Sequence, residues 1–110
     1  MATTVNLGEH YRGDTIQFGV TIRWSTGAVI NIAGMDLEYI IQDDLGTQVV
    51  VTTPAEIVID DGPNGHCIVT VDETQTATLN PSSCLHQLRL TMGADLYTVM
   101  RGTVAILEDL

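Results

Sequence analysis

The chain has 110 residues, 45% of them hydrophobic, and its 14 acidic residues face four arginines and no lysine, for a formal net charge of −10. This length fits a single domain with one core. No apolar run is long enough to span a bilayer, so a membrane partner is not expected. Neutralising a phosphate backbone takes clustered basic residues, which this chain lacks, so a nucleic-acid partner is not expected either.

The N-terminal sequence predicts a protein that is made and folded in a cytoplasm. Residues 1–5 lack the basic start and the apolar run of a secretory signal. The acidic residues are dispersed along the chain, and dispersed charge favours a well-solvated surface over a surface that attracts a basic partner.

The first part of the chain predicts short strands. Residues 3–7 form a candidate first strand, within an N-terminal arm of residues 1–8. An apolar residue at every second position of 15–24 predicts a strand with one buried face, formed by Ile16, Phe18, Val20, Ile22 and Trp24. A turn at 25–27 and a brief apolar strand at 28–32 follow.

Two hairpins come next. Leu37, Tyr39 and Ile41 face one way in the expected strand 36–43, and Ile40 faces the other, which suggests that both faces are covered. The loop 43–46 returns into the Val-rich strand 47–52. A cluster of turn residues at 60–65 joins the expected strands 56–60 and 66–71.

A short helix and a final hairpin complete the chain. Asp72 and Gln75 have the spacing of a capping box, and Asn80-Pro81 ends the helix by Leu79, with Ala77 and Leu79 as its core anchors. Strands at 83–91 and 96–107 follow, and residues 108–110 are expected to fray. The pattern predicts one all-β domain over 1–110, an antiparallel sandwich or barrel with one short helical turn.

The two cysteines, Cys67 and Cys84, are expected to be free and buried, because nothing marks an oxidising compartment. A zinc site from these cysteines with His66 and His86 is disfavoured. Its spacing is not that of a zinc finger, and neighbours on a strand point to opposite faces.

Other polar groups suit turns better than sites. Asp60, Asp61 and Asn64 could bind calcium, but the loop lacks the bidentate glutamate of helix-loop-helix calcium sites, so a hairpin turn is preferred. The same interpretation applies to Asp43 and Asp44. The cell-adhesion tripeptide at 12–14, Arg-Gly-Asp, is also better explained as a turn, because a three-residue match arises often by chance.

Catalysis is not predicted. Ser82, Ser83 and Cys84 are candidate nucleophiles, yet none sits in a motif that would aim it. His86 on an apolar strand face suggests a core histidine, and His10 and His66, beside glycine-containing turns, are expected to be exposed. The expectation is a non-enzymatic protein without catalytic, cofactor or metal residues.

The order of these elements resembles a known group of phage proteins. The features that carry the resemblance are Tyr11-Arg12-Gly13-Asp14-Thr15 before an alternating strand, Ile32-Ala33-Gly34-Met35, Val58-Ile59-Asp60-Asp61-Gly62, the segment 72–79, and Met100-Arg101-Gly102-Thr103-Val104. From residue 11 to 107 the chain is similar to small β-sandwich domains of tailed bacteriophages, such as the N-terminal domain of baseplate upper proteins and fibre-associated structural proteins.

The resemblance implies an immunoglobulin-like β-sandwich in a virion, assembled in the host cytoplasm, that docks on other virion proteins as a capsid decoration protein or as a neck, tail or baseplate adaptor. A homo-oligomer or symmetric array is expected. Residues 3–7 are a candidate arm that pairs with an adjacent subunit, since open sheet edges accept strands. The alternative is a carbohydrate- or receptor-binding module on the virion surface. It is weakened by the few aromatic residues, of which Phe18 and Trp24 are expected in the core.

Overall fold

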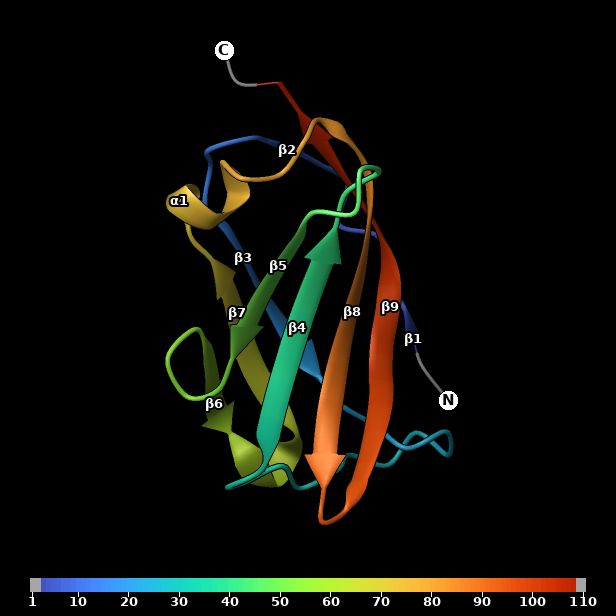
Figure 1. The fold of residues 1–110 in the computed structure, drawn as a ribbon. Coiled ribbons are helices and arrows are strands. Elements are labelled where there is room, and N and C mark those ends of the chain that lie inside the picture. The colour runs from blue at the N-terminus through green and yellow to red at the C-terminus, as the bar shows by residue number, and fades with distance from the viewer. Residues whose placement is uncertain (1–2, 109–110) are drawn as a thin grey trace.

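A computed structural model describes residues 3–108 as two β-sheets packed face to face (Figure 1). Sheet A has the strand order β1-β9-β8-β4-β5, with β2 also paired to β9, and sheet B has the order β3-β7-β6. The strands of sheet A are β1 (Thr3–Thr4), β2 (Glu9–Tyr11), β4 (Asp36–Gln42), β5 (Gln48–Thr52), β8 (Ser82–Met92) and β9 (Asp95–Leu107). Those of sheet B are β3 (Ile16–Thr21), β6 (Ile57–Asp61) and β7 (His66–Val71). The prediction of an all-β sandwich is confirmed.

The core lies between the sheets and follows the alternation of the strands. In β4 the side chains of Leu37, Tyr39 and Ile41 are buried, as the sequence predicted, while those between them face outward. The same alternation holds along β5, β7 and β8, so one row of each strand packs against the opposite sheet. Both cysteines belong to this core and are free, as predicted.

Strand β3 is shorter than the sequence predicted, and Trp24 is not a core residue. The strand ends at Thr21, and Trp24 remains 48% exposed. Its N–H donates to the carbonyl of Ala28 at 2.8 Å, and the N–H of Gly27 donates to the Trp24 carbonyl at 2.9 Å. These bonds close a tight turn, so the alternation that buries Ile16 does not continue to the indole.

The strand expected at 28–32 is reduced to a single bridge between Arg23 and Val29. The segment instead packs against the 3-10 turn η1 (Gly62–Asn64), where the N–H of Ile32 donates to the carbonyl of Gly62 at 2.9 Å. Its two isoleucines are buried. The apolar residues were therefore assigned correctly to the core, but the prediction of a strand is wrong.

The helix α1 (Glu73–Thr76) begins with the predicted capping box. Asp72 accepts from the Gln75 N–H at 2.8 Å, and the Gln75 side chain accepts from the Asp72 N–H at 3.0 Å. Leu79 is buried as expected, but Ala77 is exposed and is not an anchor.

The N-terminal segment Thr3–Tyr11, called the arm below, lies along the edge of sheet A. Both of its strands pair with β9 of the same chain, and they do so in parallel. The expected antiparallel arrangement is thus interrupted at this edge. In the structure the arm belongs to its own sheet. Met1 and Ala2 of the expected arm, and Asp109 and Leu110 of the expected tail, lie outside the described residues.

Candidate functional site

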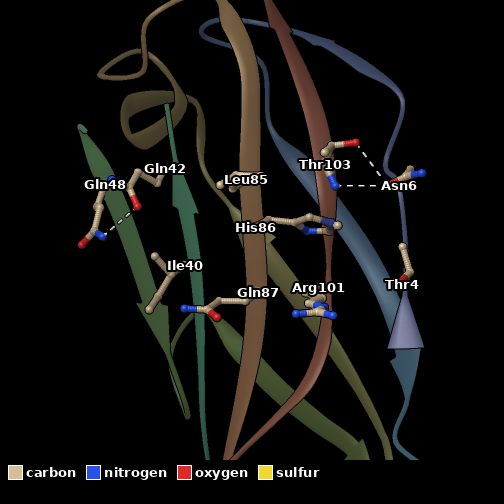
Figure 2. A pocket seen from close by; sticks show the side chains of 11 residues that line it. Thr4, Asn6, Ile40, Gln42, Gln48, Leu85, His86, Gln87, Arg101 and Thr103 are labelled. Carbon is tan, nitrogen blue, oxygen red and sulfur yellow. Dashed lines mark hydrogen bonds between the residues drawn. The ribbon is translucent and has the colours of Figure 1, made fainter. Parts of the chain in front are cut away.

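A trough lies on the outer face of sheet A (Figure 2). It has a volume of about 440 Å³, within the range of ligand pockets. It crosses β5, β4, β8 and β9 and reaches the arm. It is lined by Thr4, Asn6, Ile40, Gln42, Gln48, Leu85, His86, Gln87, Arg101, Gly102 and Thr103.

Strand register brings these side chains together. In β8 the inward row carries the core, so Leu85 and Gln87 face outward. Leu85 pairs with Gln42 of β4 on one side and with Thr103 of β9 on the other. The hairpin of β8 and β9 and the distant strand β4 therefore contribute to one row across the trough.

The polar part of the trough consists mainly of side-chain amides. Gln48 Nε2 donates to Gln42 Oε1 at 3.3 Å across the β4–β5 hairpin. At the opposite wall, Asn6 Oδ1 accepts from both the N–H and the hydroxyl of Thr103, each at 3.1 Å. An amide both donates and accepts, so this lining can bind the peptide groups of a partner or the hydroxyl groups of a sugar.

The apolar part is centred on Leu85, which is 64% exposed on a strand of the sheet. Ile40, predicted to be covered on its outward side, is half-buried and lines the same trough. A partner that covers Leu85 would gain free energy from burying it, so the trough offers an apolar contact beside its polar groups.

The electrostatic character of the trough differs from that of the chain as a whole. None of its lining residues is acidic, and Arg101 is its one charged residue, although the chain carries a net charge of −10. Within residues 3–108, Arg101 has no ion pair, whereas Arg89 lies 3.7 Å from Glu38 nearby on the same sheet. Arg101 is therefore available to a ligand atom in the trough.

His86 joins the core to the arm behind this lining. Its Nδ1 lies 2.8 Å from the Tyr39 hydroxyl, and its Nε2 lies 2.6 Å from the Val5 carbonyl oxygen. A carbonyl can only accept, so Nε2 carries the proton and Nδ1 accepts from Tyr39. Burial raises the pKa of Tyr39, with a further contribution from Cys84, and burial lowers the pKa of His86 against the opposing effect of the Val5 carbonyl. His86 is thus the core histidine that the sequence predicted.

Gly102 makes the contact between His86 and the arm possible. It is the residue of β9 that pairs with His86. A Cβ at Gly102 would overlap the carbonyl of Val5. The missing side chain leaves room for the imidazole to meet the arm at this point.

The polar residues of the loop 60–66 bond to one another in the structure. Asp61 accepts from Asn64 Nδ2 at 2.9 Å, and His66 Nδ1 lies 2.6 Å from Asp60 Oδ1, so these side chains serve the turn. In the described part of the chain, no three His, Cys, Asp or Glu residues are placed to hold a metal ion. His66 is half-buried and Cys67 fully buried, as opposite faces of a strand require.

Two of the candidate nucleophiles, Ser82 and Cys84, are characterised by their contacts and their ionisation. Ser82 Oγ donates to the Asn80 carbonyl at 3.1 Å. Burial raises the pKa of Cys84, and it raises that of Cys67 to about 12, with a smaller contribution from Asp60. Such thiols remain protonated and unreactive at neutral pH. Both nitrogens of His86 are engaged by Tyr39 and Val5.

The Arg-Gly-Asp tripeptide forms a turn, as predicted. Gly13 has φ 88°, and its N–H donates to Thr76 Oγ1 at 3.1 Å. The Thr76 hydroxyl in turn donates to the Asp14 carbonyl at 2.8 Å. The tripeptide thereby connects the arm to α1 and β3.

Asp43 is a residue whose role the sequence did not reveal. It is buried, and its carboxylate accepts from the N–H groups of Leu45 and Thr47 and from both the N–H and the side chain of Asn80. The backbone N–H of Asn80 is the main cause of its lowered pKa. It closes the hairpin loop, as expected, and also ties that loop to the segment before β8.

Comparison of the chain with protein-family models and with curated proteins gives no match. None of the helices formed by residues 3–108 has the length and apolarity needed to cross a membrane.

Proposed function

We propose that the chain is a non-enzymatic structural protein of a tailed-phage virion that docks on another virion protein through the trough of sheet A. The observation that carries this proposal is the trough itself, an acid-free, amide-lined surface around exposed Leu85 on a strongly acidic chain. The resemblance of residues 11–107 to phage β-sandwich domains supports the assignment to a virion.

The chemistry of the trough suits a protein partner. Covering the side chain of Leu85 would contribute about 2 kcal/mol to association. The amides of Gln42, Gln48 and Gln87 can satisfy peptide groups that the partner buries, and buried peptide groups need such partners. Arg101 supplies one charged contact. Such a contact contributes more to the orientation and register of the bound partner than to its affinity.

The test replaces Leu85 by glutamate in the phage that encodes the chain. We expect the wild-type protein in purified particles. We expect Leu85→Glu to be depleted from them, because losing about 2 kcal/mol weakens docking about 30-fold. Quantitative mass spectrometry of the particles measures incorporation, and circular dichroism of the purified variant measures folding.

Leu96→Glu is the matched control. Leu96 is also an exposed leucine of sheet A, 57% accessible, but it lies near the tip of the β8–β9 hairpin, outside the trough. It should enter particles normally. Equal incorporation of both variants, or the absence of the wild-type chain from particles, would contradict the proposal.

A carbohydrate-binding module on the virion surface is the second candidate, and the amide lining is the observation that favours it. Glutamine, asparagine and threonine side chains suit neutral hydroxyl groups, and Leu85 and Ile40 offer an apolar floor. The exposed aromatics Tyr11, Trp24 and Tyr97, which would stack on sugar rings, lie outside the trough. Titration of the chain with neutral hexasaccharides, followed by NMR shifts of the trough amides, distinguishes this candidate from protein docking.

A further inference from the structure

The arm is attached to a core that is complete without it. Every fully buried apolar residue of the described chain lies at or after Ile16. The arm contributes only Val5 and Leu7, which are partly buried against the rest. The rest of the described chain, residues 12–108, is called the body below. The free energy that the body gains by burying its core therefore does not depend mainly on the arm.

The edge of β9 binds the arm mainly through backbone groups in a defined register. The N–H of Val5 donates to the Arg101 carbonyl at 2.8 Å, and that of Leu7 donates to the Thr103 carbonyl at 3.0 Å. The N–H of Ala105 donates to the carbonyl of Gly8 at 2.8 Å. The contacts of Asn6 with Thr103 add a side-chain determinant to this register.

The carbonyl group of Val5 is bound at one defined position. Gly102 leaves the space that this carbonyl occupies, and the imidazole of His86 donates a hydrogen bond to it. Both belong to the body, on β9 and β8, while Val5 belongs to the arm. The arm and the body are thus complementary in the manner of a peptide and its binding site, as in strand addition to a sheet edge.

The connection between arm and body is anchored on the body side. Thr76 of α1 holds Gly13 and Asp14 by hydrogen bonds. For the arm to leave β9, the bond from the Arg12 N–H to the Leu107 carbonyl, at 2.9 Å, must open together with the bonds of the arm, and rotations before Gly13 would then leave β3 in its position.

We propose that the chain assembles with itself by arm exchange: the segment Thr3–Tyr11 of one copy pairs with β9 of a second copy, whose His86 donates to the incoming Val5 carbonyl. Every arm contact described above joins the arm to the body, so an identical arm from another copy forms the same bonds. Exchange of an identical element is a low-cost route to oligomers. Two copies that exchange arms with each other form a closed dimer, whereas copies that each pass the arm to the next form an extended assembly. In an array, neighbouring copies are held close together, and this high local concentration of the chain favours arm exchange.

This inference does not depend on the partner that occupies the trough. It is tested on the full chain with the double substitution Asn6→Cys/Thr103→Cys, oxidised after refolding at low and at high protein concentration. Arm exchange predicts disulfide-linked dimers and larger species on non-reducing gels, in a fraction that increases with concentration. Monomers with an internal disulfide at every concentration would overturn the proposal.

Two matched variants control the experiment. Gln42→Cys/Gln48→Cys joins paired residues within the β4–β5 hairpin and should give only internal disulfides. Adding Gly102→Ala to the Asn6/Thr103 pair blocks the Val5 carbonyl and should remove the intermolecular product. Persistence of that product would show that its cross-links form without the docked arm, and would also overturn the proposal. Both native cysteines are fully buried, and the unmodified chain reports any contribution from them.

Discussion

At the scale of single residues, His86 combines two roles that are usually separate. Its ring packs edge-on to Tyr39 inside the core, with centroids 5.6 Å apart, and its Nε2 holds the arm at Val5. Its neutral form suits both contacts, and burial lowers its pKa because desolvation penalises the charged imidazolium. Tyr39 and Val5 are the groups that face its two nitrogens.

The lowered pKa of His86 makes stability depend on pH in a defined direction. The unfolded chain binds a proton at His86 more tightly than the folded chain does. The stabilisation that neutral His86 gives to the folded chain is therefore complete above the ordinary pKa of 6.5. It is lost as the pH falls from that value toward the lower folded pKa. We expect urea denaturation to show a falling free energy of unfolding over this interval, and His86→Gln to show a shallower slope.

The wild-type protein gives a direct check that needs no variant. NMR titration of the imidazole should place the pKa of His86 below 6.5, and the amides of Val5 and Leu7 should shift in the same interval. A His86 pKa at or above 6.5 would contradict the prediction. Asp43, whose pKa is also lowered, affects stability only at more acidic pH, below the ordinary value of 3.8, so the two intervals are separable.

At the scale of elements, the capping box of α1 shows how a local signal fixes a short helix. A helix of four residues has little stability of its own, so its terminal hydrogen bonds matter. We expect Asp72→Ala to lower the free energy of unfolding by about 1 kcal/mol, measured by urea denaturation.

Thr74→Ala is the control for this substitution, because Thr74 is exposed in the same helix and has no part in the capping box. It should change stability by less than Asp72→Ala. Equal effects of the two substitutions would mean that helix propensity, and not the cap, is responsible.

Local patterns predicted most of the strands but not their long-range partners. Alternation predicted the buried rows of β4 and β8, and turn residues predicted the hairpins. Trp24 continued the alternation of β3 in sequence, but the strand ends at Thr21 and Trp24 belongs to the turn that follows. The trough needs the register of Gln42, Leu85 and Thr103, and the carboxylate of Asp43 needs Asn80, 37 positions away. Such contacts depend on tertiary pairing, which no local pattern encodes.

At the scale of the whole molecule, the separation of arm and body leads to a prediction about truncation. We expect a chain without residues 1–7 to fold into the same sandwich, because the core begins at Ile16. It loses the backbone bonds of Val5 and Leu7 to β9, both contacts of Asn6 with Thr103, and the bond from His86 to Val5. At about 1 kcal/mol per bond, these five bonds predict that the truncated chain is less stable by about 5 kcal/mol.

Circular dichroism and thermal denaturation measure both expectations, with the full chain as reference. The truncated chain should also fail to enter particles if arm exchange takes part in assembly. An unfolded truncated chain would show instead that the arm is needed to complete its own sheet.

The parallel pairing of the arm with β9 has a mechanical consequence. Thr3 lies beside Met100, and Tyr11 lies beside Leu107, so the two segments run in the same direction along the edge. Tension applied between the start of the arm and the end of β9 slides one segment past the other and strains all of their hydrogen bonds at once. An arm lifted from one end loses those bonds one by one. A link between copies made in this way would form by peeling and re-pairing, yet would resist stretching along the strands.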